Sequence, residues 1–275
     1  MAGTDIRSIA FIGFGEVGQT FARGLTRREG LAVSAYDIAP AGARREAMDR
    51  VARELGVAWR SGAGDAARGA DVVISAVTAA EAEAVAEAAA GYLAPGQIFL
   101  DVNSAAPTTK QRAARHVERA GASYVEGAVM GPVKGPGIAV PILAGGPAAA
   151  YAAMRLNRLG MQLTAVATEY GLASAIKLSR SIMIKGIEAL MVDCAASCDR
   201  WGIADTVYAS LAETFPGTDW HAVAASMRER VATHGVRRAA EMREAGEMLA
   251  ALGIDPSLAN AVADAQLRGV RRREK

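Results

Sequence analysis

The stretch Ser8-Ile-Ala-Phe-Ile-Gly-Phe-Gly-Glu-Val-Gly18 decides the fold of the first half of the chain. Residues 8–12 are an apolar run with the length of a buried strand. Gly13, Gly15 and Gly18 follow in the spacing Gly-x-Gly-x-x-Gly, and apolar residues at helical spacing come after them. A strand, a glycine-rich turn and a helix in this order favour a dinucleotide-binding unit over a glycine-rich loop of another α/β domain.

Each glycine of this motif has a physical role. We expect Gly13 to permit the tight turn out of the strand, Gly15 to let a pyrophosphate approach the backbone, and Gly18 to let the helix pack closely. The helix N-terminus then offers free N–H groups and the positive end of its dipole to the phosphates. Asp37 lies about 20 residues after the motif, where a carboxylate binds the hydroxyls of the adenosine ribose.

Asp37 also bears on the choice between NAD and NADP. A carboxylate repels a 2′-phosphate, and no arginine follows Asp37 directly, so the sequence favours NAD. NADP is less favoured, but it remains an alternative because Arg44 and Arg45 could turn toward a 2′-phosphate.

Composition limits the classes of function. The 275 residues have room for one large or two modest domains, and the formal net charge of +2 argues against a nucleic-acid partner. No uncharged apolar run reaches the roughly 18 residues of a membrane span, and the start of the chain lacks the pattern of a signal peptide. We therefore expect a cytoplasmic protein that binds neither nucleic acid nor membrane.

Metal binding is not expected. Cys194 and Cys198 lie four apart on a predicted helix, which is more typical of two small core residues than of a metal pair. The three histidines, His116, His221 and His234, lack the spacing of metal ligands.

Strand and helix patterns alternate up to about residue 166. Strands are expected at 8–12, 31–36, 57–60, 71–77, 97–102, 123–129, 140–144 and 162–166, and helices at 19–28, 46–55, 79–93, 107–120 and 148–158. This alternation predicts an α/β fold with a Rossmann-type, mostly parallel, doubly wound sheet that is covered on both faces. We assign residues 1–167 to this dinucleotide-binding domain.

Only helices are expected after residue 168. They cover 171–201, 204–213, 220–234, 236–252 and a last segment from 257, and they form an all-α C-terminal domain at 168–275. The first of them is roughly 45 Å long. One chain cannot readily bury such a helix, so we expect a homodimer through the helical domain.

Three segments follow predicted strands, at the edge where such sheets bind ligands. These are Thr78, Asn103-Ser104 and Met130-Gly131-Pro132. On the long helix, Lys177 shares a face with Arg180 and Ser181. A lysine between apolar neighbours can be partly desolvated, which suits acid–base chemistry. An ordinary solvated helix lysine is the alternative.

Four blocks, in this order, resemble the β-hydroxyacid dehydrogenase superfamily, which contains the 3-hydroxyisobutyrate, tartronate semialdehyde and 6-phosphogluconate dehydrogenases. The blocks are Phe11-Ile-Gly-Phe-Gly-Glu-Val-Gly18, Asp101-Val-Asn-Ser-Ala-Ala-Pro107, Val125-Glu-Gly-Ala-Val-Met-Gly131 and Gly171-Leu-Ala-Ser-Ala-Ile-Lys-Leu178. They extend over most of residues 8–200. The first block is common to many folds, whereas the combination is specific.

The resemblance implies a role for each matching position. It assigns the cofactor to Gly13, Gly15 and Gly18, with Phe14, Glu16 and Val17 lining the loop, and to Val77 and Thr78 near the nicotinamide ribose. Asn103, which also borders the cofactor, would orient the substrate together with Ser104. Backbone around Met130 and Gly131 would bind a substrate carboxylate. Lys177 would be the general acid/base.

Some positions depart from the pattern of the superfamily. Met130 and Pro132 stand where a serine and a glycine are usual, which removes a hydroxyl from the expected carboxylate site. Ser181 replaces the usual asparagine four residues after the lysine. Ile184 replaces the glutamate that protonates the product carbon in phosphogluconate dehydrogenases, which argues against that decarboxylation.

A charged stretch in the helical half offers two interpretations. If residues 230–242 are helical, His234, Arg237, Arg238 and Glu241 lie on adjoining faces. This cluster, or Arg180, could bind the substrate anion in place of the serine hydroxyl that is missing at Met130. The alternative is a charged surface face with ion pairs between Arg237 and Glu241.

These observations predict an NAD-dependent dehydrogenase that acts on a hydroxyl near a carboxylate or similar anion in a small molecule. One alternative is an imine reductase, a related chemistry whose enzymes usually lack a lysine at position 177. The other is a non-catalytic dinucleotide-binding sensor, which would explain the altered positions 130, 132 and 181.

Overall fold

The computed structural model describes residues 6–39 and 41–273. It divides into two compact units, Met1–Lys177 and Leu178–Lys275, and the division falls within one long helix. The predicted domain boundary, after residue 167, lies just before that helix.

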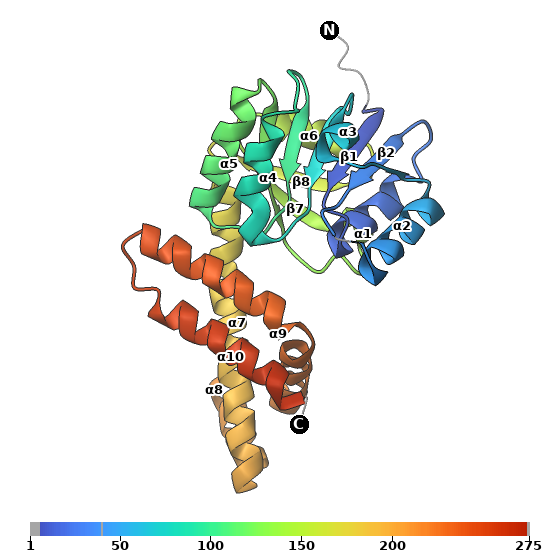
Figure 1. The fold of residues 1–275 in the computed structure, drawn as a ribbon. Helices are drawn as coiled ribbons and strands as arrows, with labels where there is room; N and C mark the ends of the chain where they lie inside the picture. The colour runs from blue at the N-terminus through green and yellow to red at the C-terminus, as the bar shows by residue number, and fades with distance from the viewer. Residues whose placement is uncertain (1–5, 40, 274–275) are drawn as a thin grey trace. The chain divides into compact units, whose positions relative to one another are not determined.

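The first unit is a sheet with helices on both faces (Figure 1). Its strands are β1 (Ser8–Ile12), β2 (Ala32–Tyr36), β3 (Ala58–Trp59), β4 (Val72–Ser75), β5 (Ile98–Asp101), β6 (Ser123–Val129), β7 (Pro141–Gly145) and β8 (Gln162–Ala167). Its helices are α1 (Glu16–Leu25), α2 (Ala43–Leu55), α3 (Ala63–Ala67), α4 (Ala82–Ala89), α5 (Pro107–Arg119) and α6 (Ala149–Asn157), with short 3-10 turns η1 (Ala79–Glu81) and η2 (Gly137–Ala139). The predicted α/β class is confirmed.

The strand order is β3-β2-β1-β4-β5-β6-β7-β8. All neighbouring pairs are parallel except β6 and β7. Parallel strands need a long crossover, usually a helix, and only the short turn η2 lies between these two strands. The order reverses between β1 and β4, so this is the switch point at which open α/β sheets bind ligands.

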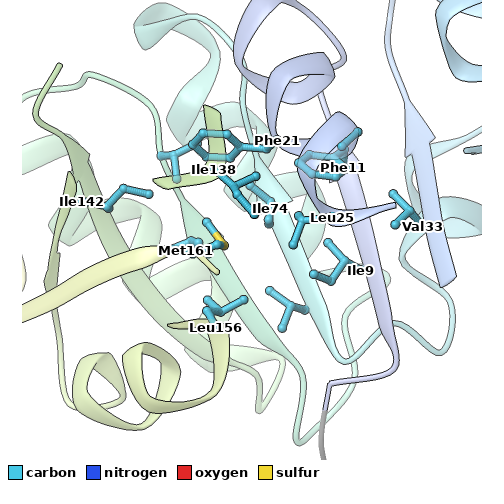
Figure 2. Packing of buried hydrophobic residues seen from close by; sticks show 14 of the residues in the cluster. Ile9, Phe11, Phe21, Leu25, Val33, Ile74, Ile138, Ile142, Leu156 and Met161 are labelled. Atoms are coloured by element: carbon cyan, nitrogen blue, oxygen red, sulfur yellow. The ribbon is translucent and has the colours of Figure 1, made fainter. Parts of the chain in front are cut away.

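The two faces of the sheet are filled differently. One face carries large side chains, among them Phe11 of β1, Phe21 and Leu25 of α1, and Ile142 of β7 (Figure 2). On the opposite face, α3, α4 and α5 contribute the alanines Ala66, Ala67, Ala86, Ala89, Ala113 and Ala114, which pack beside larger side chains such as Phe99 and Tyr124 of the sheet. Small residues let these helices lie close to the strands.

The second unit is helical. It contains most of α7 (Leu172–Trp201), together with α8 (Ala204–Thr214), α9 (Trp220–Ala251) and α10 (Ser257–Arg273). Residues of α7, α8 and α9 share one apolar cluster, which includes Cys198 and is bordered by Cys194. Cys198 is thus a small core residue as expected, whereas Cys194 is only partly buried. Within the described part of the chain, no helix is long and apolar enough to cross a membrane.

The expectation of two helices at 220–234 and 236–252 is wrong, because α9 runs through both. Gly235 was the apparent break. It instead marks close packing: a Cβ there would lie 2.5 Å from the carbonyl oxygen of Gln266 and from Cγ2 of Val270. Gly269 of α10 faces α9 in the same way, because its Cβ would lie 2.3 Å from Cγ1 of Val231. The glycines let α9 and α10 approach each other.

Replacing Gly235 by alanine is therefore expected to destabilise the helical unit. In an open helix this change adds stability, whereas here the overpacked contact with α10 costs about 1–3 kcal/mol. Arg237→Ala, an exposed change on the same helix, is the control and should leave the free energy of unfolding almost unchanged. Urea unfolding followed by circular dichroism measures both. Equal stability of Gly235→Ala and wild type would contradict the packing role of Gly235.

Candidate functional site

The turn between β1 and α1 has the geometry that the glycine motif predicts. Gly13 has a φ of +92°, and a Cβ there would lie 2.4 Å from the carbonyl oxygen of Ala76. A Cβ at Gly18 would lie 2.5 Å from the carbonyl oxygen of Gly13. At Gly15 a Cβ would meet nothing within 4 Å. Gly13 and Gly18 are therefore needed for packing, whereas Gly15 leaves open space over the start of α1.

Asp37, at the end of β2, is tied to this turn. One carboxylate oxygen accepts the Phe14 N–H at 2.8 Å, and the other accepts the Ala39 N–H at 2.8 Å. Each carboxylate oxygen has a second lone pair, which a ribose hydroxyl could use. Asp37 therefore shapes the glycine turn as well as standing where the adenosine ribose is expected.

The other residues of the turn differ in their placement. The Phe14 side chain is fully buried and makes an edge contact with the Trp59 ring, so only its backbone can line a bound cofactor. Val17 packs partly against the same core, and Glu16 is exposed. The sequence pattern alone did not show that the Phe14 side chain is buried in the core while the Glu16 side chain is exposed.

Arg45 is held near the same end of the sheet. Its guanidinium lies over the Trp59 ring at 4.7 Å from the centroid and within 3.4 Å of the Asp49 carboxylate. It also donates to the Ala39 carbonyl at 3.3 Å. Arg44 is exposed.

Contacts continue from the turn to the next two strands. Cγ1 of Val77 is one of the atoms that exclude a side chain at Gly13. The Val77 N–H donates to Oδ1 of Asn103 at 2.6 Å, and Nδ2 of Asn103 donates to the Ser75 hydroxyl at 2.9 Å. The structure thus brings together the predicted residues that follow β1, β2, β4 and β5. Thr78 is exposed at the start of η1.

A buried ion pair lies next to Asn103, at the carboxyl end of β5. Asp101 and Lys110 are fully buried and paired at 2.8 Å. Asp101 also accepts the Tyr124 hydroxyl at 2.7 Å and the Asn103 N–H at 2.9 Å. Burial, reinforced by the Asp101 carboxylate, raises the pKa of Tyr124. The sequence pattern did not predict a role for Lys110 or Tyr124, although a lysine among the apolar positions of a helix is a usable signal of a buried ion pair.

Ser104 and the loop after β6 also carry predicted residues of the first unit. The Ser104 hydroxyl oxygen is buried and has no hydrogen-bond partner in the described structure. The Met130 N–H donates to the Pro141 carbonyl, and Gly131 is exposed. Lys134 of the same loop lies 4.0 Å from the Glu16 carboxylate, so this loop reaches the glycine turn.

The start of α7 is fixed against the sheet. Glu126 of β6 accepts the N–H groups of Gly171 and Ser174, each at 2.6 Å. A Cβ at Gly171 would lie 3.0 Å from Cβ of Pro107, at the start of α5. Lys177 is half-buried one turn further along α7. Glu126 lies in the matching block Val125–Gly131, but no role for it was predicted from the sequence.

The remaining predicted residues belong to the second unit. Arg180 and His234 are exposed. Ser181 is buried: its hydroxyl donates to Glu241 at 2.5 Å and accepts from the Lys185 ammonium at 3.0 Å. Lys185 also pairs with Glu241 at 3.0 Å. Burial lowers the pKa of Lys185, and the Glu241 carboxylate opposes this shift.

The charged cluster of α9 is divided between surface and interior. Arg238 pairs with the fully buried Glu188 of α7 at 3.0 Å, and Arg230 reaches the same carboxylate at 3.1 Å. His234 and Arg237 remain exposed. The interpretation of this stretch as a purely surface face is therefore wrong, because Arg238 and Glu241 are buried and bind residues of α7.

The residues at the switch point fit a dinucleotide. The open space at Gly15 is a cradle that any side chain would fill, and the start of α1 has no side-chain cap. N–H groups there would hold the diphosphate, and Asp37 the ribose. No group of three or more His, Cys, Asp or Glu side chains suited to a metal ion occurs among the described residues.

Comparisons with known proteins agree with this geometry. The family model described as the NAD binding domain of 6-phosphogluconate dehydrogenase matches residues 8–167, and a domain of unknown function, DUF1932, matches residues 198–268. The chain is 41% identical to a conserved hypothetical protein from Sinorhizobium meliloti 1021, with 95% of this chain and 88% of that chain covered and a TM-score of 0.80.

Two further structures are similar. A conserved protein of unknown function, MTH1747, described as structurally similar to 3-hydroxyacid dehydrogenases, is 31% identical over 97% of this chain and 98% of its own, with a TM-score of 0.76. The 3-hydroxyisobutyrate dehydrogenase of Mycobacterium tuberculosis shares the fold at 20% identity, with 96% and 93% covered and a TM-score of 0.77. The chain therefore belongs to the β-hydroxyacid dehydrogenase superfamily, as an NAD(P)-binding member whose 6-phosphogluconate dehydrogenase-type domain is followed by a DUF1932 domain.

Proposed function

We propose that this protein is an NAD-dependent dehydrogenase that oxidises a hydroxyl group near a carboxylate or a similar anion. One observation carries the proposal: an unbroken set of contacts joins Asp37, the glycine turn, Val77 and Asn103 at the switch point of the sheet. A cofactor bound along this edge would extend from the ribose site at Asp37 toward Asn103.

Lys177 is the proposed general acid/base. Its neutral amine would accept the proton of the substrate hydroxyl, and its ammonium would return that proton in the reverse direction. The bound nicotinamide supplies the hydride chemistry. Asn103 would orient the substrate from a fixed position, because its amide is already held by Val77 and Ser75.

The substrate anion would be bound by backbone around Gly131. Arg180 and His234, which are both exposed, are the proposed replacements for the hydroxyl that Met130 removes. Ser181 would contribute only as an acceptor, because its single proton goes to Glu241. We place this chemistry in the cytoplasm, on the charge and the apolar pattern of the sequence.

Lys177 distinguishes this proposal from its alternatives. Imine reductases usually lack a lysine at this position, and a sensor has no need of one. The lysine lies in the matching block Gly171–Leu178, and its turn of α7 is tied to the sheet, which supports a dehydrogenase.

Replacing Lys177 by alanine should lower kcat by a factor of about 100 or more, because proton transfer loses its general base. NADH affinity should stay unchanged. Turnover is measured as NADH formation at 340 nm against hydroxy acids, sugar acids and aryl β-hydroxy compounds, with wild type in parallel wells. Activity within a few-fold of wild type would remove Lys177 from the mechanism. Tight NADH binding by wild type without turnover of any compound would instead favour the sensor.

The cofactor preference can be measured without a substrate. NADH should bind about tenfold more tightly than NADPH, a difference of about 1.4 kcal/mol, because the Asp37 carboxylate repels a 2′-phosphate. Fluorescence titration gives both dissociation constants. Asp37→Asn keeps an acceptor for the Phe14 N–H but removes the charge, so it should narrow the difference. Equal affinities in wild type would overturn the preference.

We also propose a homodimer through the helical unit. Met183, Ile187 and Leu190 form an apolar stripe on α7, with side chains that are 63%, 42% and 74% exposed. Burying such a stripe against a second copy removes apolar surface from water.

Leu190→Glu should convert the dimer into monomers at micromolar concentration, because the partner surface cannot solvate a buried carboxylate. Light scattering after size-exclusion chromatography measures the mass. Arg200→Glu, which changes an exposed position on another side of the same helix, is the control and should stay dimeric. A monomeric wild type would contradict the proposal.

A further inference from the structure

A carboxylate lies in the middle of strand β6, on a residue with no solvent exposure. Glu126 stands between Val125 and Gly127 and is the only charged residue of this strand. A buried carboxylate is costly unless hydrogen-bond donors or an opposite charge meet it. Its partners therefore indicate the purpose of this residue.

Both partners are backbone groups at the start of α7. Oε2 of Glu126 accepts the Gly171 N–H, and Oε1 accepts the Ser174 N–H, each at 2.6 Å. The first N–H groups of a helix have no acceptor within the helix, and the positive end of the helix dipole lies there. Glu126 thus caps the start of α7 through Gly171, which lies 45 residues later in the chain.

Two glycines leave room for this cap. Gly145 pairs with Glu126 across β6 and β7, and a Cβ at Gly145 would lie 2.7 Å from Oε2 of Glu126. Gly171 has a φ of +99°, and a Cβ there would press on Pro107 of α5. A side chain at either position would displace the carboxylate or one of its donors.

Lys177 follows Ser174 by three residues and so lies one turn further on the same side of α7. We propose that Glu126 is a positioning residue for Lys177: it fixes the first turn of α7 to the sheet and thereby fixes where the lysine amine points. This inference rests on the proposed role of Lys177. Displacing a reacting group by about 1 Å can cost about 100-fold in rate, so the cap matters for the chemistry.

Lysine acetylation tests the inference without a substrate. Acetic anhydride is applied to the full chain, and peptide mass spectrometry follows the acetylation of each lysine. Lys134, whose side chain is 84% exposed, is the internal reference, and Lys110, fully buried in its ion pair, reports unfolding of the first unit. In Glu126→Gln the rate at Lys177 relative to Lys134 should rise about threefold or more, because the uncapped turn opens locally. Glu126→Asp, which keeps the charge, should give a smaller rise.

Asp71→Asn is the matched control. Asp71 also accepts backbone N–H groups, from Arg7 and Ser8 at 2.8 and 2.9 Å, but at the opposite, amino-terminal edge of the sheet. The Asp71→Asn variant should have a lower melting temperature, but its rate of acetylation at Lys177 relative to Lys134 should equal that of wild type. If Glu126→Gln does not fold, Gly145→Ala replaces it, since it keeps every charge and pushes on the carboxylate.

Two results would overturn the inference. One is an unchanged Lys177 ratio in the Glu126 variants. The other is a rise at Lys110 that parallels the rise at Lys177, which would assign Glu126 to general stability. Full turnover by Lys177→Ala would instead overturn the proposed function and leave the labelling result in place, so the two failures are distinguishable.

Discussion

The contact between the backbone of Gly13 and the carbonyl of Ala76 is the constraint on which the first unit depends. It brings the end of β1 against the end of β4 at the point where the strand order reverses. A Cβ at position 13 would clash with the Ala76 carbonyl, so this position of the turn must be glycine. The opening of α1, the tie to Asp37 and the placement of Val77 all follow from this approach.

Charged groups inside the protein act as fixed supports. Asp101, which is paired with Lys110, accepts the Asn103 N–H, and Glu126 accepts N–H groups from the first turn of α7. Removing one member of a buried pair leaves an unpaired charge, which is far more costly than losing a surface ion pair. Here such groups fix the Asn103 backbone and the first turn of α7 by directional hydrogen bonds.

The sequence was sufficient where local pattern decides structure. Periodicity predicted the alternation of the first unit and the long helix α7, and the spacing of Gly13, Gly15 and Gly18 predicted the turn between β1 and α1. It was insufficient where a partner distant in the chain decides. Gly235 looks like a helix break until α10 is seen against it, and Ser181 looks available until Glu241 takes its proton. Glu126 is a similar case, because its partners come much later in the chain.

The unequal filling of the sheet has a consequence for how the protein tolerates mutation. On the face that Phe21 and Leu25 fill, most substitutions are to smaller side chains, and the damage is a cavity that neighbours can partly close. At the alanine positions of the opposite face, such as Ala86 and Ala113, almost every substitution except glycine is larger, and the damage is overpacking. The alanine positions of this face therefore accept few larger side chains, whereas its large members, such as Phe99 and Tyr124, are open to the same cavity-forming changes as Phe21 and Leu25.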